Sequence, residues 1–142
     1  MNISSYTLSK HQFNEWLKTY SNSLFCCNVR IEHFFGPGDD SSKFVIRIIN
    51  KLIKNVSYIN LTKGNQKRDF VFIKDVVDAI KIIIKDSLRY KNGYTNYDIG
   101  KGVSISIKKF ILLVCKLTRN KSTKLNFGIL KLRKREAMDI KV

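Results

Sequence analysis

The sequence has few of the residues that cross-link or interrupt a chain. Its 142 residues include one proline and three cysteines. Cys26 and Cys27 are adjacent, the third is Cys115, and no spacing of cysteine or histidine resembles a zinc site. We therefore expect reduced thiols in a cytoplasmic protein, and no metal site. No apolar run reaches the ~18 residues of a membrane-spanning helix, which indicates that a membrane is not among its partners.

Acidic residues are also scarce. The chain has 11 acidic and 27 basic residues, for a formal net charge of +16. Such an excess is typical of nucleic-acid-binding proteins when it is concentrated on one stripe. Here most lysines are scattered, and only residues 131–135 form a dense cluster. We interpret most of the charge as solvated surface and predict no nucleic-acid partner, while a basic nucleic-acid-binding domain remains the weaker alternative.

Glycine-rich phosphate-binding turns are missing too. Neither GxGxxG nor GxxxxGK[ST] occurs in the sequence, and the first predicted element is a helix rather than a strand. Dinucleotide-binding α/β folds begin with a strand and such a turn. The sequence is therefore expected to be the later part of a larger α/β protein, with the N-terminal cofactor-binding half absent.

Hydrophobic periodicity predicts alternating helices and strands. The predicted helices cover 8–21 and 43–55, then run from Asp75 to about residue 90 and from Ser104 to 117, and the predicted strands cover 24–31, 57–61, 69–73 and 96–99. We expect Asp75 and Ser104 to cap their helices. Trp16 is interpreted as a core aromatic, although the apolar stripe of the first helix would be partly exposed without upstream strands. The alternation indicates an α/β fold.

The first helix carries a possible catalytic pair. Tyr6 and Lys10 stand four residues apart, which places both side chains on one helical face. A nearby ammonium favours the phenolate form of a tyrosine, which can then exchange a proton with a sugar hydroxyl or ketone. The pair alone is weak evidence for a catalytic site, because a lysine-rich chain produces this spacing by chance. Tyr97 and Lys101 repeat the spacing on a predicted strand and turn. A surface tyrosine is the alternative.

A series of segments in order resembles one enzyme family. The segments are Tyr6–Lys10, 28–30 with 35–38, 64–73, 75–79, 97–105 and 133–138. They resemble the C-terminal half of the NAD-dependent epimerase/dehydratases, extended short-chain dehydrogenases that act on nucleotide sugars. The resemblance implies the C-terminal portion of a Rossmann-like, doubly wound parallel sheet with a small substrate-binding region. Residues 1–56 would hold the catalytic helix and the strand, loop and helix after it, and 57–142 the sheet's tail and the nucleotide-sugar-binding region.

The resemblance also implies roles for individual residues. Tyr6 would be the general acid/base, and Lys10 would favour its phenolate and hold the nicotinamide ribose of NAD or NADP, so both are catalytic and cofactor-binding. The loop from Arg30 to Gly38 would lie beside the nicotinamide and the sugar, which places Arg30 among the substrate-binding residues.

Three further residues would bind the nucleotide sugar. His33 stands where many family members have a substrate-contacting Asn, and a packed histidine is the alternative. Arg68 and Arg133 would meet the diphosphate, since a guanidinium fork can bind two oxygens. The alternative for Arg68 is a structural ion pair with a neighbour such as Asp69. Arg133 lies among other basic residues in 131–135, so its alignment with the family's arginine is open.

Within the family, residues 32–40 and 61–64 resemble dideoxysugar-nucleotide synthases of the CDP-abequose type, NADPH-dependent 4-ketoreductases of lipopolysaccharide O-antigen biosynthesis. The sequence therefore predicts the distal half of a nucleotide-sugar epimerase, dehydratase or 4-ketoreductase, inactive as an isolated chain. Its expected partners are a nucleotide-diphosphate sugar and either a second copy or a complementing upstream fragment. A non-catalytic remnant is the alternative.

Overall fold

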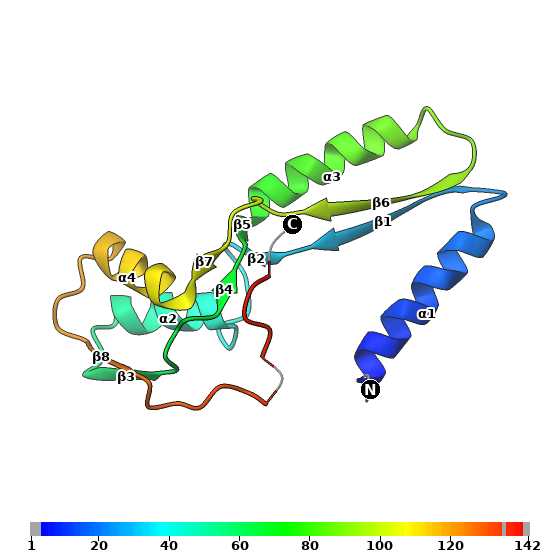
Figure 1. The fold of residues 1–142 in the computed structure, drawn as a ribbon. Helices are drawn as coiled ribbons and strands as arrows, with labels where there is room; N and C mark the ends of the chain where they lie inside the picture. The colour runs from blue at the N-terminus through cyan, green and yellow to red at the C-terminus, as the bar shows by residue number, and fades with distance from the viewer. Residues whose placement is uncertain (1–3, 135, 141–142) are drawn as a thin grey trace. The chain divides into compact units, whose positions relative to one another are not determined.

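A computed structural model describes residues 4–134 and 136–140, which form two compact units (Figure 1). One unit comprises the chain up to Ile31 together with Asp75–Ile99. The other comprises Glu32–Lys74 together with the chain from Gly100 onward. The expected regions 1–56 and 57–142 were divided by function, and that division stays a prediction.

The first unit contains a parallel pair of strands with helices before and between them. Its elements are α1 (Ser5–Tyr20), β1 (Phe25–Ile31), α3 (Ile73–Ser87) and β6 (Gly93–Ile99). β1 and β6 pair in parallel, from Phe25 opposite Gly93 to Ile31 opposite Ile99. A parallel pair requires a crossover between its strands, and α3 lies within that crossover and runs opposite to both strands (Figure 1).

Helix α1 begins earlier than its apolar stripe indicates. The hydroxyl of Ser4 accepts a hydrogen bond from the Thr7 amide at 3.1 Å, so Ser4 is the N-cap and the helix starts at Ser5. No residue of α1 is buried. Phe13 is 58% exposed, and Trp16 is 66% exposed. The interpretation of Trp16 as a core aromatic is therefore wrong, because Trp16 packs into no core within residues 4–134 and 136–140. The expected exposure of the apolar stripe is confirmed.

Helix α3 also begins before the expected position. It starts at Ile73, which places Asp75 inside the first turn. The prediction that Asp75 caps this helix is therefore wrong. A carboxylate in the first turn still stabilises the helix, because it faces the partial positive charge of the free backbone N–H groups.

The second unit is built from short paired strands and two helices. Its elements are β2 (His33–Phe35), α2 (Phe44–Ile53), β3 (Tyr58–Leu61), β4 (Lys67–Arg68), β5 (Phe70–Phe72), β7 (Ile105–Ser106), α4 (Ile107–Leu117) and β8 (Lys124–Phe127). β2 pairs with β5 and β3 with β8 in parallel, while β4 and β7 are antiparallel. The expected α/β class with parallel strands is confirmed, although β2, β4, β7 and β8 were not expected.

The core of the second unit lies between α2, α4 and β3. Ile48 and Leu52 of α2 and Ile111 of α4 are almost completely buried, at 2%, 1% and 0% exposure. Ile48 and Leu52 are four residues apart and therefore share one face of α2. Burying apolar side chains of this size stabilises the fold by ~1.5–3 kcal/mol each. This packing fixes α2 and β3, which carry part of the site described below.

The cap of α4 is Ser106 rather than Ser104. The Ser106 hydroxyl accepts a hydrogen bond from the Lys109 amide at 3.1 Å. The Ser104 hydroxyl lies 2.6 Å from the Asp139 carboxylate, to which it donates. The prediction that Ser104 caps this helix is therefore wrong, and Ser104 instead contacts the C-terminal segment.

A buried carboxylate fixes the turn after β6. Asp69 is fully buried, and its two oxygens accept the backbone N–H groups of Lys101 at 3.0 Å and Gly102 at 2.8 Å. These contacts satisfy the carboxylate without an arginine. The alternative interpretation of Arg68, a structural ion pair, is found in the structure, but its partner is Glu136 rather than Asp69.

The loop after β2 depends on a glycine for close packing. A Cβ at Gly36 would lie 2.2 Å from Cγ2 and 2.9 Å from Cβ of Ile73. Only glycine therefore fits between the end of β2 and the residue that follows β5. The turn continues through Gly38, whose φ of +81° lies in the left-handed region that favours glycine.

Candidate functional site

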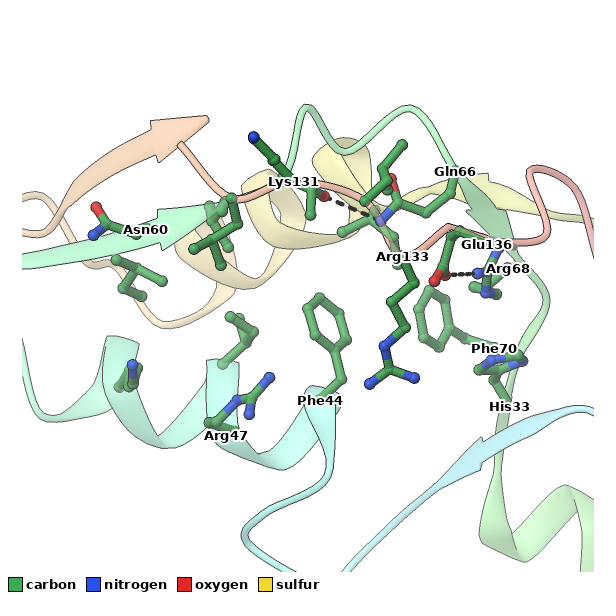
Figure 2. Close-up of a pocket in the computed structure, with 18 of the residues that line it drawn as sticks. His33, Phe44, Arg47, Asn60, Gln66, Arg68, Phe70, Lys131, Arg133 and Glu136 are labelled. Atoms are coloured by element: carbon green, nitrogen blue, oxygen red, sulfur yellow. Dashed lines mark hydrogen bonds and ion pairs between the residues drawn. The ribbon is translucent and has the colours of Figure 1, made fainter. Parts of the chain in front are cut away.

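The second unit contains a cavity of about 710 Å³. Its walls come from α2, β3, the β4–β5 region and the segment that follows β8 (Figure 2). The cationic lining residues are Arg47, Lys51, Arg68, Lys131 and Arg133, and the lining also includes the rings of His33, Phe44, Tyr58 and Phe70. Pockets of this volume with aromatic walls and a few convergent polar groups are typical small-molecule sites. The excess of positive charge favours an anionic ligand.

Arg68 lies in the cavity wall but is held by the protein itself. Its side chain is 8% exposed. One guanidinium nitrogen donates to the carbonyls of Lys67 and Ala137, both at 2.7 Å, and the other pairs with the Glu136 carboxylate. Arg68 therefore attaches the segment around 136–138 to β4. Most of its hydrogen-bonding capacity is used before any ligand arrives.

Arg133 lies in the same C-terminal segment and is free of such contacts. Its side chain points into the cavity (Figure 2), and the described part of the chain offers it no ion-pair partner. The structure thus places both arginines expected at the diphosphate, Arg68 and Arg133, around one cavity. Arg135, the last residue of the basic cluster, lies outside the described residues.

His33 is at the same cavity, on β2. Its ring meets Phe70 edge-on, with centroids 6.2 Å apart, and its Nδ1 lies 3.7 Å from the Glu32 carboxylate. Partial burial lowers the pKa of His33 from 6.5, and the positive charge of Arg68 lowers it further, against the opposing effect of Glu32. The imidazole is therefore neutral at neutral pH, and it can accept as well as donate a hydrogen bond.

Arg30 belongs to the other unit, on β1. Its guanidinium forms a two-point ion pair with Asp98 of β6, with nitrogen–oxygen distances of 2.5 and 2.7 Å. Arg30 and Asp98 stand directly opposite each other in the parallel register. The pair cross-links the two strands, and binding of substrate by Arg30 stays a prediction that would require this pair to open.

Tyr6 and Lys10 lie on one face of α1, as their spacing predicts. The Lys10 ammonium is 5.5 Å from the centroid of the Tyr6 ring, and the Tyr6 side chain is 71% exposed. The Tyr97–Lys101 repeat differs, because Tyr97 belongs to β6 and Lys101 to the turn after it. Only the first pair has the geometry of a paired tyrosine and ammonium.

Several cavity residues were not expected from the sequence. Phe44, Arg47 and Lys51 line the cavity from α2, and Glu136 lines it from the C-terminal segment. The sequence of α2 does indicate these three residues, because Phe44, Arg47 and Lys51 follow helical spacing and border the apolar face. Lysines are scattered over the whole chain, so this pattern did not stand out. Glu136 could be recognised only from its contact with Arg68.

In the part of the chain that the structure describes, no group of three or more His, Cys, Asp or Glu side chains is arranged to hold a metal ion. No helix in residues 4–134 and 136–140 is long and apolar enough to span a membrane.

A family model matches more than half of the chain. The model of the NAD dependent epimerase/dehydratase family matches residues 2–100. The chain belongs to this family. The match includes α1, both strands of the parallel pair and the wall of the cavity up to Phe70, and the expected family is confirmed.

Curated relatives extend the match to almost the whole chain. The CDP-abequose synthase of Salmonella typhimurium is 35% identical over 136 residues, which cover 94% of this chain and 45% of the relative. The chain thus spans about half the length of the curated relatives it matches. The resemblance to the dideoxysugar-nucleotide subgroup is borne out by this similarity.

Solved structures of other epimerase-type proteins share the fold. A UDP-N-acetylglucosamine 4-epimerase from Methanobrevibacter ruminantium, in complex with UDP-N-acetylmuramic acid, superposes with a TM-score of 0.80 at 19% identity. MoeE5, solved with UDP-glucose and NAD, superposes with a TM-score of 0.81 at 20% identity. Each match covers 99% of this chain and 45–46% of the solved chain. At this identity the likeness shows the fold alone, which is part of a Rossmann-like α/β fold.

Proposed function

We propose that this chain provides the catalytic helix and the nucleotide-sugar pocket of an NAD(P)-dependent nucleotide-sugar 4-ketoreductase for dideoxysugar synthesis. The observation that carries the proposal is the cavity of about 710 Å³, with five cationic side chains and aromatic walls. A nucleotide-diphosphate sugar offers an anionic diphosphate flanked by a planar base and a sugar. The similarity to CDP-abequose synthase favours a cytidine nucleotide and a reductase over an epimerase or dehydratase.

The residues of α1 fit the nicotinamide end of the cofactor. Tyr6 and Lys10 face the same side, and the exposed Tyr6 hydroxyl is accessible to a ligand. Lys10 would hold the nicotinamide ribose hydroxyls. When bound, the nicotinamide ring supplies the hydride. The 142 residues contain no glycine-rich turn for the cofactor's pyrophosphate, so this fit concerns one end of the cofactor.

Tyr6 is the proposed general acid. Its hydroxyl would give a proton to the oxygen of the 4-keto group as that carbon is reduced, and the Lys10 ammonium would stabilise the phenolate left behind. Arg30 and His33 are proposed to contact the sugar, and Arg68 and Arg133 the diphosphate side of the pocket. A cytoplasmic location is part of the proposal, because Cys26, Cys27 and Cys115 are all free thiols.

A partner for the exposed face of α1 is also proposed. The stripe containing Phe13 and Trp16 is exposed, and large exposed apolar patches mark interaction sites. A complementing upstream polypeptide or a second copy would cover it. The nucleic-acid alternative is weaker, because five of the cations line one cavity rather than an extended stripe.

A chimera tests the function. The chain would replace the matching C-terminal part of the Salmonella CDP-abequose synthase, and reduction of the 4-keto nucleotide sugar would be followed by NAD(P)H absorbance. We expect turnover by the chimera and none by the 142-residue chain alone. Turnover by the isolated chain would contradict its proposed inactivity. A folded chimera that binds no nucleotide sugar would overturn the proposed function.

A further inference from the structure

Helix α2 presents two cations to the cavity, Arg47 and Lys51, which none of the family motifs includes. Phe44, Arg47, Ile48 and Lys51 all line the cavity, at the spacing of one helical face. Ile48 is buried in the core and so fixes the rotation of the helix. Arg47 is exposed to solvent, and its guanidinium points toward the cavity, as Figure 2 shows.

Arg47 and Arg133 approach the cavity from different walls. Arg47 rises from α2, and Arg133 descends from the segment after β8 (Figure 2). Neither guanidinium has an ion-pair partner among residues 4–134 and 136–140. The one carboxylate in the lining, Glu136, is engaged by Arg68. Two unpaired guanidinium groups therefore converge on the same space.

Two guanidinium groups at one cavity favour an anionic ligand. Both arginines are exposed, so solvent screens much of their mutual repulsion, and an anion between them would gain charge-assisted hydrogen bonds from both. His33 does not change the balance, since its neutral form is favoured by partial burial and by Arg68. The cationic lining therefore favours a compact anion over a neutral ligand.

We propose that Arg47 is a diphosphate-binding residue, which clamps the diphosphate together with Arg133 from the opposite wall. Arg68 then acts as a positioning residue, because its contacts with Ala137 and Glu136 hold the segment that carries Arg133. Each free guanidinium can offer two parallel N–H donors to phosphate oxygens, which a lysine cannot do. The assignment rests on the proposed function, because it takes a nucleoside diphosphate as the ligand.

Titration of the 142-residue chain with CDP and with cytidine, followed by calorimetry, tests this role. Arg47→Gln should weaken CDP binding about tenfold or more and leave cytidine binding unchanged, since charge-assisted hydrogen bonds to phosphate are lost and base contacts are kept. The salt dependence of CDP binding should also decrease. Lys54→Gln is the matched control: it removes a cation just after α2, outside the cavity lining, and should bind CDP as the unaltered chain does.

The outcomes separate this inference from the proposed function. Unaltered CDP binding by Arg47→Gln, in a chain that binds CDP, would overturn the role of Arg47 and leave the function standing. An equal loss in Lys54→Gln would also overturn it, because the effect would then be one of general charge. A folded chain that does not bind CDP would overturn both. Should Arg47→Gln unfold, Arg47→Lys keeps the charge without the fork and should weaken CDP binding about threefold.

Discussion

Arg68 of β4 donates a 2.7 Å hydrogen bond to the backbone carbonyl of Ala137, a residue far along the chain. The same guanidinium donates to the Lys67 carbonyl and pairs with Glu136. One buried side chain therefore holds the C-terminal segment against β4. Because this segment carries Arg133, the position of a proposed ligand-binding residue depends on an arginine whose own donors are largely used within the protein.

Substitution of Arg68 should destabilise the fold. Arg68→Gln is expected to lower the free energy of unfolding by about 2–3 kcal/mol, since hydrogen bonds to charged groups are lost and Glu136 keeps a partly buried charge. Urea unfolding followed by circular dichroism measures the change. Arg89→Gln is the control, because Arg89 forms an exposed ion pair with Asp86 at 3.5 Å and should change stability by less than about 1 kcal/mol. Equal losses in the two variants would contradict the anchoring role.

The stability of the fold should be equally sensitive to Asp69→Asn, which keeps the shape of the side chain and removes its charge. In Asp69→Asn one oxygen that now accepts an amide N–H, from Lys101 or Gly102, becomes an NH₂ group facing a donor. A buried unsatisfied pair of this kind costs about 1–3 kcal/mol, and more where a charge-assisted bond is lost. The midpoint of urea unfolding should fall accordingly. Asp86→Asn, on the exposed pair with Arg89, is the control and should leave the midpoint almost unchanged.

The larger helices could be predicted from the sequence because their apolar spacing is long and regular. Their starts could not, since a start depends on which polar side chain finds a free backbone N–H. Ser106 accepts from Lys109, while Ser104 is taken by Asp139, a contact across 35 positions. Likewise β8 (Lys124–Phe127) is defined by its pairing with β3, which no local pattern in so short a strand reveals.

The site residues that could be predicted from the sequence are those that belong to the family's motifs. His33, Arg68 and Arg133 were expected at the substrate, and all three line one cavity. Arg47 was not expected, because a single exposed arginine on a mostly apolar helix is typical of solvated surface, and its place at the cavity follows only from the fold. The hydrogen bond from Arg68 to the Ala137 carbonyl could not be predicted from the sequence either, since it joins segments that are distant in sequence.

The state of His33 should make stability depend on pH. Its pKa is lowered in the folded protein by partial burial and by Arg68, with Glu32 and Glu136 opposing. Below 6.5 the unfolded chain takes up a proton that the folded chain resists, so stability present above this pH is lost as the pH falls. The unfolding midpoint should therefore decrease from pH 7.5 to pH 5.5, as measured by urea titrations.

Two variants assign that dependence. His33→Asn should flatten the change between pH 7.5 and pH 5.5, because the titrating ring is removed. His11→Asn, on the exposed face of α1, is the control and should retain the dependence. The carboxyl of Asp40 does not interfere, since hydrogen bonds from Ser42 lower its pKa below 3.8 and outside this window. A steep dependence that survives in His33→Asn would contradict the assignment.

The catalytic role of Tyr6 can be measured in the chimera with the Salmonella relative. Tyr6→Phe removes the hydroxyl and keeps the ring over which the Lys10 ammonium lies, 5.5 Å from the centroid. General acid/base groups contribute about 100-fold or more, so turnover should fall at least that far while cofactor binding stays near normal. Stopped-flow absorbance gives the turnover, and quenching of NAD(P)H fluorescence gives the binding.

Tyr20→Phe is the matched control for this substitution. Tyr20 lies at the other end of α1 and is 61% exposed, so loss of its hydroxyl tests for a general effect on the helix. Its turnover should equal that of the unaltered chimera. If Tyr6→Phe retains turnover within about tenfold, the group does not transfer the proton. If both variants lose turnover together, the loss reflects the exposed face of α1 and its contact with a partner, rather than proton transfer at Tyr6.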